Sequence, residues 1–507
     1  MPALSSADRV RPRIPWARAL LGMAAALFVA LSPAGPASGA APRDPVEGYW
    51  WGTAGSVRER TDVGLHFVRS GDGKLTLRIT QPVSNYFDAD AGGEVRRDGD
   101  QVQHEGLFLS LQLDGDTLRG TYPGPNSPAT FTRTRRLPAE SSPPALPPGP
   151  APRWETRIGG QVYASPAVAD GIAYIGTTGG VVNAVDTRDG KLRWTFATGA
   201  PVFASVTVAG DAIYVVADNG LLYRLDRGDG KERWRYVLGD ADVARVLPHP
   251  QVYAWDWQAA QPVVADGVVY VGAGDGGFHA VAAEDGKRRW RFDTRGAIRN
   301  AAAVDGDTVY VGSMDQFVYA LSRGDGRERW RSDTGAAIDA ALVVHDGRVL
   351  AGNRGAGLLS LDAASGETKW RLFFWGSWVE STPVVRDGVI YVGSSDLRRV
   401  NAIDPSDGHV LWRTDVYGWT WGTPLVTERH IYAGVAGGTP YFIRHLASFS
   451  VLDRRSGKLV ARRPLADTGG HQWGIAGSPA LAGDTVVVAT IAGSLFGFPL
   501  IEAATFK

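Results

Sequence analysis

The sequence of 507 residues contains no cysteine. This absence excludes disulfide bonds, thiolate metal sites and a lipid attached to an N-terminal cysteine. It also suits a protein that works in an oxidising compartment. The chain has no excess of either charge, because 53 lysine and arginine residues balance 53 aspartate and glutamate residues. Binding to nucleic acid or to an anionic membrane surface is therefore not indicated.

The N-terminus lacks an apolar run long enough to cross a bilayer. The run at residues 19–31 has 13 residues, whereas a spanning helix needs roughly 20. Four arginines precede it, and Ser38, Gly39 and Ala40 supply small residues after it. This order predicts a secretory signal peptide at residues 1–40 rather than the alternative, a membrane anchor. We expect a periplasmic or secreted protein with no membrane span.

A repeated stretch organises the rest of the chain. Residues 266–272 read Asp-Gly-Val-Val-Tyr-Val-Gly, and related copies stand at 170–176 and 387–393. A glycine then precedes a tryptophan by four positions, as at Gly190 and Trp194, and successive tryptophans lie about 40 residues apart. Short alternating Val/Ile/Tyr runs between Asp-Gly turns indicate strands, and a period near 40 is typical of four-stranded propeller blades. The recurring tryptophans are predicted to be core residues.

Eight copies of the strand can be counted, but the last lacks its outer Gly-to-Trp strand, and the seventh has Ala461 in place of the tryptophan. Trp154, by contrast, precedes the first copy without a partner. We expect its strand to complete the eighth blade and close the ring, which removes exposed sheet edges. The predicted fold is all-β, an eight-bladed propeller over residues 153–507.

A small separate β domain is expected at residues 41–137. Alternating runs at 63–68 and 74–80 flank a Gly-Asp-Gly turn, and further strands are expected at 107–113, 117–122 and 129–135. These predict one antiparallel sheet curled into a small barrel or sandwich, serving as a ligand cup or docking module, or as a spacer. Residues 138–152 are rich in proline and should form an extended linker that does not pack into a sheet.

The repeats resemble the PQQ-like, or quinoprotein-type, propeller family over roughly residues 153–500. That resemblance implies two kinds of function. One group of the family consists of quinone-dependent alcohol and sugar dehydrogenases. The other is non-catalytic and includes the propeller lipoprotein of the outer-membrane β-barrel assembly machine. Fold alone does not choose between them.

Candidate binding residues come from the connections that enter each innermost strand, because these connections surround one mouth of a propeller channel. One repeat position, two residues before a Ser-Pro-like pair, differs from blade to blade instead of converging on one residue type. It reads Tyr163, Phe203, Ala259, Arg299, Asp339, Glu380, Trp421 and Ala476. Aromatics out of the blade register, including Trp257 and Trp473, should lie nearby. Such a mixture suits a planar or sugar-like ligand, or a docking rim for protein.

Two insertions add further candidates. The segment 237–258 carries Trp255, Asp256 and Trp257, and it resembles the part of quinoprotein dehydrogenases in which an aspartate beside the cofactor acts as base. Asp256 would be that catalytic base, and Glu380, Asn300 and Asp339 would be the calcium ligands. The cysteine pair common in the alcohol-oxidising members is absent, and Gln258 stands where a second acid often occurs. A second insertion at 437–449 could cover the mouth as a lid or form a longer hairpin loop.

Three functions follow as hypotheses. The first is an extracytoplasmic propeller that binds a ligand or an envelope protein at its central funnel without catalysis. The alternative is a quinoprotein oxidoreductase that uses pyrroloquinoline quinone and calcium on an alcohol or sugar. The third is a carbohydrate-binding propeller, suggested by the same aromatic residues.

Overall fold

The structure is a computed structural model that describes residues 44–55, 60–123, 127–239, 256–439, 441 and 443–501. The predicted signal peptide lies outside these ranges. The chain divides into two compact units, Met1–Ser142 and Pro143–Lys507. None of the described segments forms a helix with the length and apolar character that crossing a membrane requires.

The first unit is one curled antiparallel sheet of nine strands in the order β4-β3-β2-β1-β9-β8-β7-β6-β5. Its core lies on one face, where Trp50 is fully buried and its indole N–H donates to the Val46 carbonyl at 2.7 Å. The leucines of β7 all point into this core and alternate with exposed polar residues, as the sequence predicts. The elements are β1 (Gly48–Ala54), β2 (Thr61–Arg69), β3 (Leu75–Gln81), the 3-10 helix η1 (Pro82–Ser84), β4 (Tyr86–Asp90), β5 (Arg96–Asp98), β6 (Gln101–His104), the 3-10 helix η2 (Glu105–Leu107), β7 (Leu109–Asp114), β8 (Thr117–Thr121) and β9 (Pro128–Thr134).

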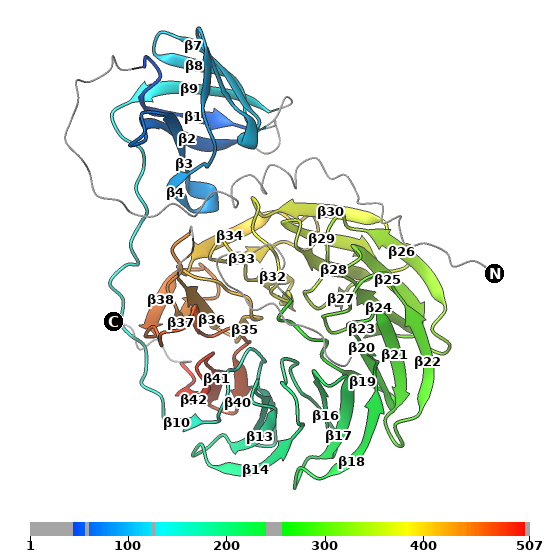
Figure 1. The fold of residues 1–507 in the computed structure, drawn as a ribbon. Coiled ribbons are helices and arrows are strands. Elements are labelled where there is room, and N and C mark those ends of the chain that lie inside the picture. Colours follow the sequence, from blue (N-terminus) through cyan, green and yellow to red (C-terminus); the bar gives the residue numbers. More distant parts are fainter. Residues whose placement is uncertain are drawn as a thin grey trace. The chain divides into compact units, whose positions relative to one another are not determined.

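The second unit is an eight-bladed propeller, which confirms the predicted fold (Figure 1). Each blade is an antiparallel sheet whose short first strand lies nearest the axis. Blades one to four are β11 (Ala167–Ala169), β12 (Ile172–Gly176), β13 (Val181–Asp186), β14 (Leu192–Ala197); β15 (Thr207–Ala209), β16 (Ala212–Ala217), β17 (Leu221–Asp226), β18 (Glu232–Val237); β19 (Val263–Ala265), β20 (Val268–Gly272), β21 (Gly277–Ala282), β22 (Arg288–Asp293); β23 (Ala303–Asp305), β24 (Thr308–Gly312), β25 (Phe317–Ser322), β26 (Glu328–Asp333).

The remaining four blades repeat this plan, with one extra strand, β39, paired to β36 in blade seven. Blades five to eight are β27 (Val343–His345), β28 (Arg348–Asn353), β29 (Gly357–Asp362), β30 (Thr368–Phe373); β31 (Val384–Arg386), β32 (Val389–Val392), β33 (Arg399–Ile403), β34 (Val410–Asp415); β35 (Leu425–Val426), β36 (His430–Gly438), β37 (Ser448–Asp453), β38 (Leu459–Pro464), β39 (Gln472–Gly474); and β40 (Ala480–Ala482), β41 (Thr485–Ala489), β42 (Ser494–Pro499), β10 (Trp154–Arg157).

The repeated glycine and tryptophan form the contact between neighbouring blades. A Cβ added at Gly366 would lie 2.5 Å from the Trp330 ring, so the tryptophan of one blade covers the glycine of the next. The Trp330 indole N–H also donates to the Ala363 carbonyl at 3.0 Å. The same covering contact repeats at six further interfaces, which explains why glycine and tryptophan recur together in the sequence.

Ring closure follows the predicted route. β10 pairs with β42, so the N-terminal strand of the propeller forms the outer edge of the last blade. Trp154 then covers Gly190 of the first blade and donates its indole N–H to the Thr187 carbonyl at 2.8 Å. Backbone pairing thereby completes the last blade, and the Trp154 side chain joins that blade to the first.

Blade seven, which has Ala461 instead of a tryptophan, is covered differently. The Pro147 carbonyl accepts a hydrogen bond from the Arg462 backbone N–H at 3.1 Å, and a Cβ at Gly149 would lie 3.5 Å from that of Ala461. In contrast to the expectation of a linker that does not pack, this part of the proline-rich segment therefore lies on the edge strand β38.

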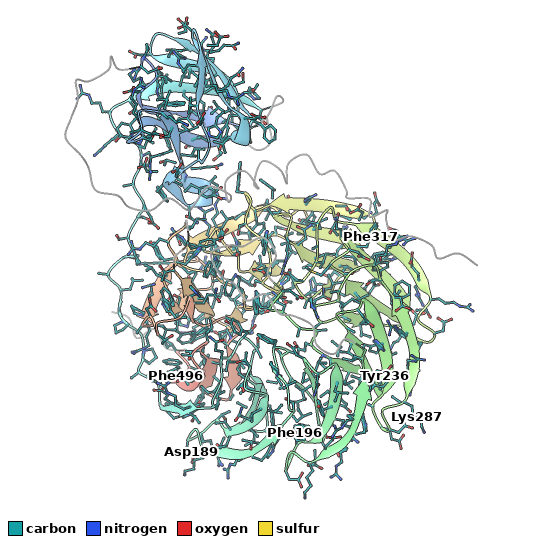
Figure 2. The ribbon with its side chains drawn as sticks, viewed as in Figure 1. Asp189, Phe196, Tyr236, Lys287, Phe317 and Phe496 are labelled. Carbon is teal, nitrogen blue, oxygen red and sulfur yellow. The ribbon has the colours of Figure 1, made fainter. Side chains whose placement is uncertain are left out.

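The outer strands place charge outside and aromatic rings between the blades. Asp189 and Lys287 lie on outer turns, whereas Phe196 and Tyr236 lie on outer strands (Figure 2). The Phe196 ring contacts Tyr223 at 5.5 Å between ring centroids. Charged side chains on an edge strand oppose pairing with another chain, so the periphery is protected against aggregation.

Candidate functional site

The eight residues of the predicted ring line one cavity at the propeller axis, with a volume of about 130 Å³. Each comes from the connection that enters an innermost strand. The structure therefore places Tyr163, Phe203, Ala259, Arg299, Asp339, Glu380, Trp421 and Ala476 together, as the repeat alignment predicted. Their gathering at one opening is a finding; their role in binding remains a prediction.

The Ser-Pro-like pair behind each ring residue has its own structural role. The Ser165 backbone N–H donates to the Ser205 hydroxyl oxygen at 2.9 Å, and the Ser478 N–H donates to the Ser165 hydroxyl oxygen at 2.8 Å. Thr423 repeats the contact toward Ser478 at 2.8 Å. These bonds join blade seven to eight, one and two in sequence. They fix the position of the ring residues two places earlier in the chain.

One side of the mouth is aromatic. Four aromatic rings form a chain of contacts. The distance between ring centroids is 5.7 Å for Phe203 and Tyr163, 5.5 Å for Tyr163 and Trp257, and 5.4 Å for Trp257 and Trp421. Trp421 in turn stacks on Trp419 at 4.8 Å. The Trp257 indole nitrogen is buried and has no hydrogen-bond partner among the described residues. The aromatic side thus offers an unused N–H donor.

The other side of the mouth is ionic. Arg299 pairs with Asp256 through two contacts of 2.8 Å, from Nε to Oδ1 and from Nη2 to Oδ2. Arg354 Nε donates to Asp339 Oδ2 at 2.5 Å, and its Nη2 lies 4.0 Å from Glu380 Oε1. Each arginine therefore has one carboxylate as its close partner, and Arg354 is also the more distant counter-ion of Glu380.

Glu380 is the most perturbed acid at the mouth. Its side chain and that of Asp339 are fully buried. Burial raises the pKa of Glu380 well above its usual value of 4.5, and the neighbouring Asp339 carboxylate raises it further, while Arg354 acts in the opposite direction. A protonated Glu380 can share its hydrogen with Asp339. The two carboxyl groups can thus carry one negative charge between them instead of two.

The predicted calcium ligands supply acceptor oxygens but not a complete set. Asn300 donates its amide to the Gly312 and Ile338 carbonyls at 3.0 and 3.1 Å, which leaves its Oδ1 without a donor among the described residues. Asp339 Oδ1 and both Glu380 oxygens are likewise without a hydrogen-bond donor there. Calcium takes about six to eight oxygens, and the Arg354 guanidinium opposes a further dication. The residues present do not fit a calcium site.

The residues and the volume of the cavity also fit poorly with a site for pyrroloquinoline quinone. Sites for small-molecule ligands of cofactor size usually have volumes of about 300 to 1,000 Å³, several times the cavity at the mouth. Asp256 Oδ2 accepts a hydrogen bond from Arg299 Nη2 and Asp256 Oδ1 lies 2.8 Å from Arg299 Nε, so this carboxylate is held in an ion pair. Trp255, which carries part of the resemblance, lies outside the described residues.

Trp473, predicted as a binding residue, does not line the cavity. It stands on β39, where a Cβ at Gly437 would lie 2.9 Å from its ring. The described part of the insertion at 437–449 packs beside the aromatic side of the mouth. His445 stacks on Trp419 with ring centroids 3.9 Å apart, and the Tyr441 hydroxyl donates to Asp396 at 3.0 Å.

Sequence reasoning missed Arg354 and Asp396. Both lie on turns between the second and third strands of a blade, and these turns return to the same face as the ring residues. A second alignment, on these turns, would have found Arg354 where Thr178, Gly274 and Met314 stand in other blades. Its guanidinium lies over the Trp378 ring at 4.6 Å, which joins the ionic and aromatic sides of the mouth.

Comparison with known proteins finds similarity to a family of outer membrane protein assembly factors. A family model described as outer membrane protein assembly factor BamB matches residues 147–254, 251–335 and 314–498. The outer membrane protein assembly factor BamB of Burkholderia pseudomallei is 34% identical over 116 residues, which cover 23% of this chain and 27% of that protein. The chain thus spans about a quarter of the length of this relative.

Solved structures share the fold at low identity. BamB from Moraxella catarrhalis is 18% identical with a TM-score of 0.53, covering 70% of this chain and 98% of its own. Quinohemoprotein alcohol dehydrogenase from Comamonas testosteroni is 15% identical with a TM-score of 0.56, and the match covers 71% of this chain and 78% of the dehydrogenase chain. The computationally designed protein Ika8 is 15% identical with a TM-score of 0.54, covering 70% and 100%. At these identities the likeness concerns the fold alone.

Proposed function

The chain belongs to the family of outer membrane protein assembly factor BamB, and on this premise we propose that it is a non-catalytic propeller that binds a protein partner of the cell envelope at its central mouth. The expected signal peptide and the similarity to an outer membrane protein assembly factor both support a role in the cell envelope.

One observation carries the proposal. Eight side chains of seven residue types converge on a cavity of about 130 Å³ that has an aromatic side and an ionic side. A repeat position that only packs has no reason to vary so widely between blades. Buried aromatic residues beside paired charges are the composition of binding hot spots between proteins. The cavity has room for the end of one side chain rather than for a cofactor.

The test fills the mouth without removing any packing contact. Ala259→Arg places a long charged side chain at a half-buried ring position, and Ala364→Arg makes the same change on an exposed turn of blade five. Each variant carries an affinity tag and is expressed in its own bacterium, cells are crosslinked, and tagged complexes are identified by mass spectrometry.

We expect Ala259→Arg to recover roughly tenfold less of its envelope partner, since losing a hot-spot contact costs about 1.4 kcal/mol or more. Ala364→Arg should recover the partner as the wild type does. Equal recovery by both variants, with both proteins folded, would show that the mouth is not where the partner binds.

The oxidoreductase alternative is tested separately. Its support is the fold shared with quinohemoprotein alcohol dehydrogenase, and the small cavity and the paired Asp256 count against it. Purified protein mixed with pyrroloquinoline quinone and calcium should show no quinone absorbance after gel filtration and no thermal shift. Retained quinone in a one-to-one ratio would restore this alternative.

The carbohydrate-binding hypothesis has less support. Sugar platforms present exposed aromatic faces, whereas Tyr163, Phe203, Trp257 and Trp421 are all buried and contact one another. A glycan array should therefore give no signal above that of an unrelated propeller.

A further inference from the structure

Glu380 stands out at the mouth because it is a buried carboxyl in a cavity wall whose oxygens meet no hydrogen-bond donor among the described residues. Only 3% of the residue is exposed. A buried ionised carboxylate without donors is costly. The Arg354 guanidinium, 4.0 Å from Glu380 Oε1, is too far away to donate a hydrogen bond, so the carboxyl group holds a proton or meets a further cation.

The charged groups that face Glu380 come from three other connections. They are Asp339 before β27, Arg354 between β28 and β29, and Asp396 between β32 and β33. Arg354 is already bonded to Asp339. Asp396 accepts from the Trp419 indole at 2.9 Å and from the Tyr441 hydroxyl at 3.0 Å. The field at Glu380 is thus dominated by acids, and it favours an added positive charge.

Three acceptor groups at the cavity lack donors among the described residues, namely Glu380, Asp339 Oδ1 and Asn300 Oδ1. A primary ammonium group has three N–H donors and no acceptor, so its number of donors equals the number of these acceptor groups. The aromatic side of the same cavity, with Trp257 and Trp421, provides apolar surface for an alkyl stem and ring faces that attract cations.

We propose that the mouth binds a primary ammonium group, the head of a lysine side chain of the protein partner, with Glu380 and Asp339 as its acceptors. The inference rests on the proposed function and specifies the chemistry that this site recognises. The cavity volume equals about four water molecules at roughly 30 Å³ each, enough for the end of a side chain.

A divalent metal ion fits the site less well. The three donor-free groups fall short of the six to eight oxygens that calcium takes. Arg354 already places a fixed positive charge 4.0 Å from Glu380 Oε1. This charge repels a divalent ion more strongly than it repels a singly charged ammonium group. The adjacent indole rings also offer a metal ion no ligand.

Binding exchanges a proton for the ammonium group. In the free protein Glu380 is protonated up to a raised pKa, because burial disfavours its charged form. The ligand arrives as R–NH₃⁺, Glu380 releases its proton to solvent, and the carboxylate accepts from the ammonium. Affinity should therefore rise about tenfold per pH unit below the pKa of Glu380 and level off above it.

The experiment uses n-butylammonium as the probe and purified protein without any partner. Binding is followed through the indole ¹H–¹⁵N resonance of Trp257, assigned with Trp257→Phe. We expect a saturable shift with n-butylammonium, none with n-butanol, and a loss of affinity of tenfold or more in Glu380→Gln. Glu367→Gln, on an exposed turn, is the matched control and should bind as the wild type does.

Other outcomes would overturn the proposal. Equal shifts with n-butanol would mean that the cavity binds the alkyl chain and does not recognise the charge of the ammonium group. Saturation by calcium with no response to the amine would mark a metal site. Unchanged amine affinity in a folded Glu380→Gln protein would exclude Glu380 as the acceptor. Because no partner is present, each result is independent of whether an envelope protein is recovered in cells.

Discussion

Glu380→Gln should stabilise the propeller progressively as pH rises. The pKa of Glu380 is raised in the folded protein by burial and by Asp339, so the folded state holds a proton that the unfolded chain loses near pH 4.5. The wild-type contribution is complete below that pH and is lost as pH rises through the folded pKa. Glutamine resembles the protonated acid and does not titrate, so its contribution is constant.

The size of the effect follows from linkage. Each pH unit within this window changes stability by at most about 1.4 kcal/mol. Unfolding entropy is about 2.1 cal/mol/K per residue, which for a unit of about 365 residues, 143–507, gives roughly 0.8 kcal/mol/K. The melting temperature of the variant should therefore gain about 2 °C on the wild type per pH unit.

The assay is a thermal melt of wild type, Glu380→Gln and the matched surface variant Glu367→Gln between pH 4 and 8. The difference between Glu380→Gln and wild type should grow from pH 4.5 and stop growing at the folded pKa, which the break in the curve locates. A difference that stays the same at every pH would refute the reasoning, because Glu380 would then titrate with the same pKa in the folded and the unfolded chain.

Three further predictions concern the blades. Gly366→Ala should lower the free energy of unfolding by about 2 to 4 kcal/mol, since φ is +75° there and the new Cβ would meet the Trp330 ring. Gly324→Ala, with open space around it, is the control and should change the free energy of unfolding in denaturant by less than about 0.5 kcal/mol. Trp154→Ala should cost about 3 to 5 kcal/mol and expose blade eight to proteolysis; an unchanged melting curve would contradict ring closure through this side chain. Burial lowers the pKa of His279 to about 4. Its contribution to stability is therefore complete above pH 6.5 and is lost as pH falls toward 4, by up to about 1.4 kcal/mol per pH unit. Urea titrations should show this dependence of the unfolding free energy on pH in the wild type and not in His279→Gln.

The sequence was sufficient to predict the propeller because one contact is repeated. A tryptophan that covers a glycine in the next blade forces both residue types to recur at one spacing, and the spacing reveals the blade. Ring closure was predictable for a related reason, since Trp154 had no other blade in which to fit. The ring at the mouth was found because its members occupy one register position but differ in type.

The rest depends on contacts that the aligned repeat position does not show. Asp339 precedes β27 and Arg354 follows β28 of the same blade, and the antiparallel pairing of these two strands brings the guanidinium to that carboxylate. Trp473 lies outside the cavity lining because β39 pairs with an extension of β36 and carries the ring over Gly437. The packing of Pro147 on β38 gave no signal, because proline composition describes an isolated segment and not the edge strand beside it.

The central claim is that the partner meets the unequal side chains at the axis. Photo-crosslinking in living cells tests it directly, with p-benzoylphenylalanine placed at Phe203 in the mouth or at Leu411, which is 47% exposed on the outer strand β34. We predict a crosslink from position 203 to one envelope protein, carrying a lysine at the crosslinked segment, and none to that protein from position 411. A crosslink to that partner from position 411 alone would contradict the account.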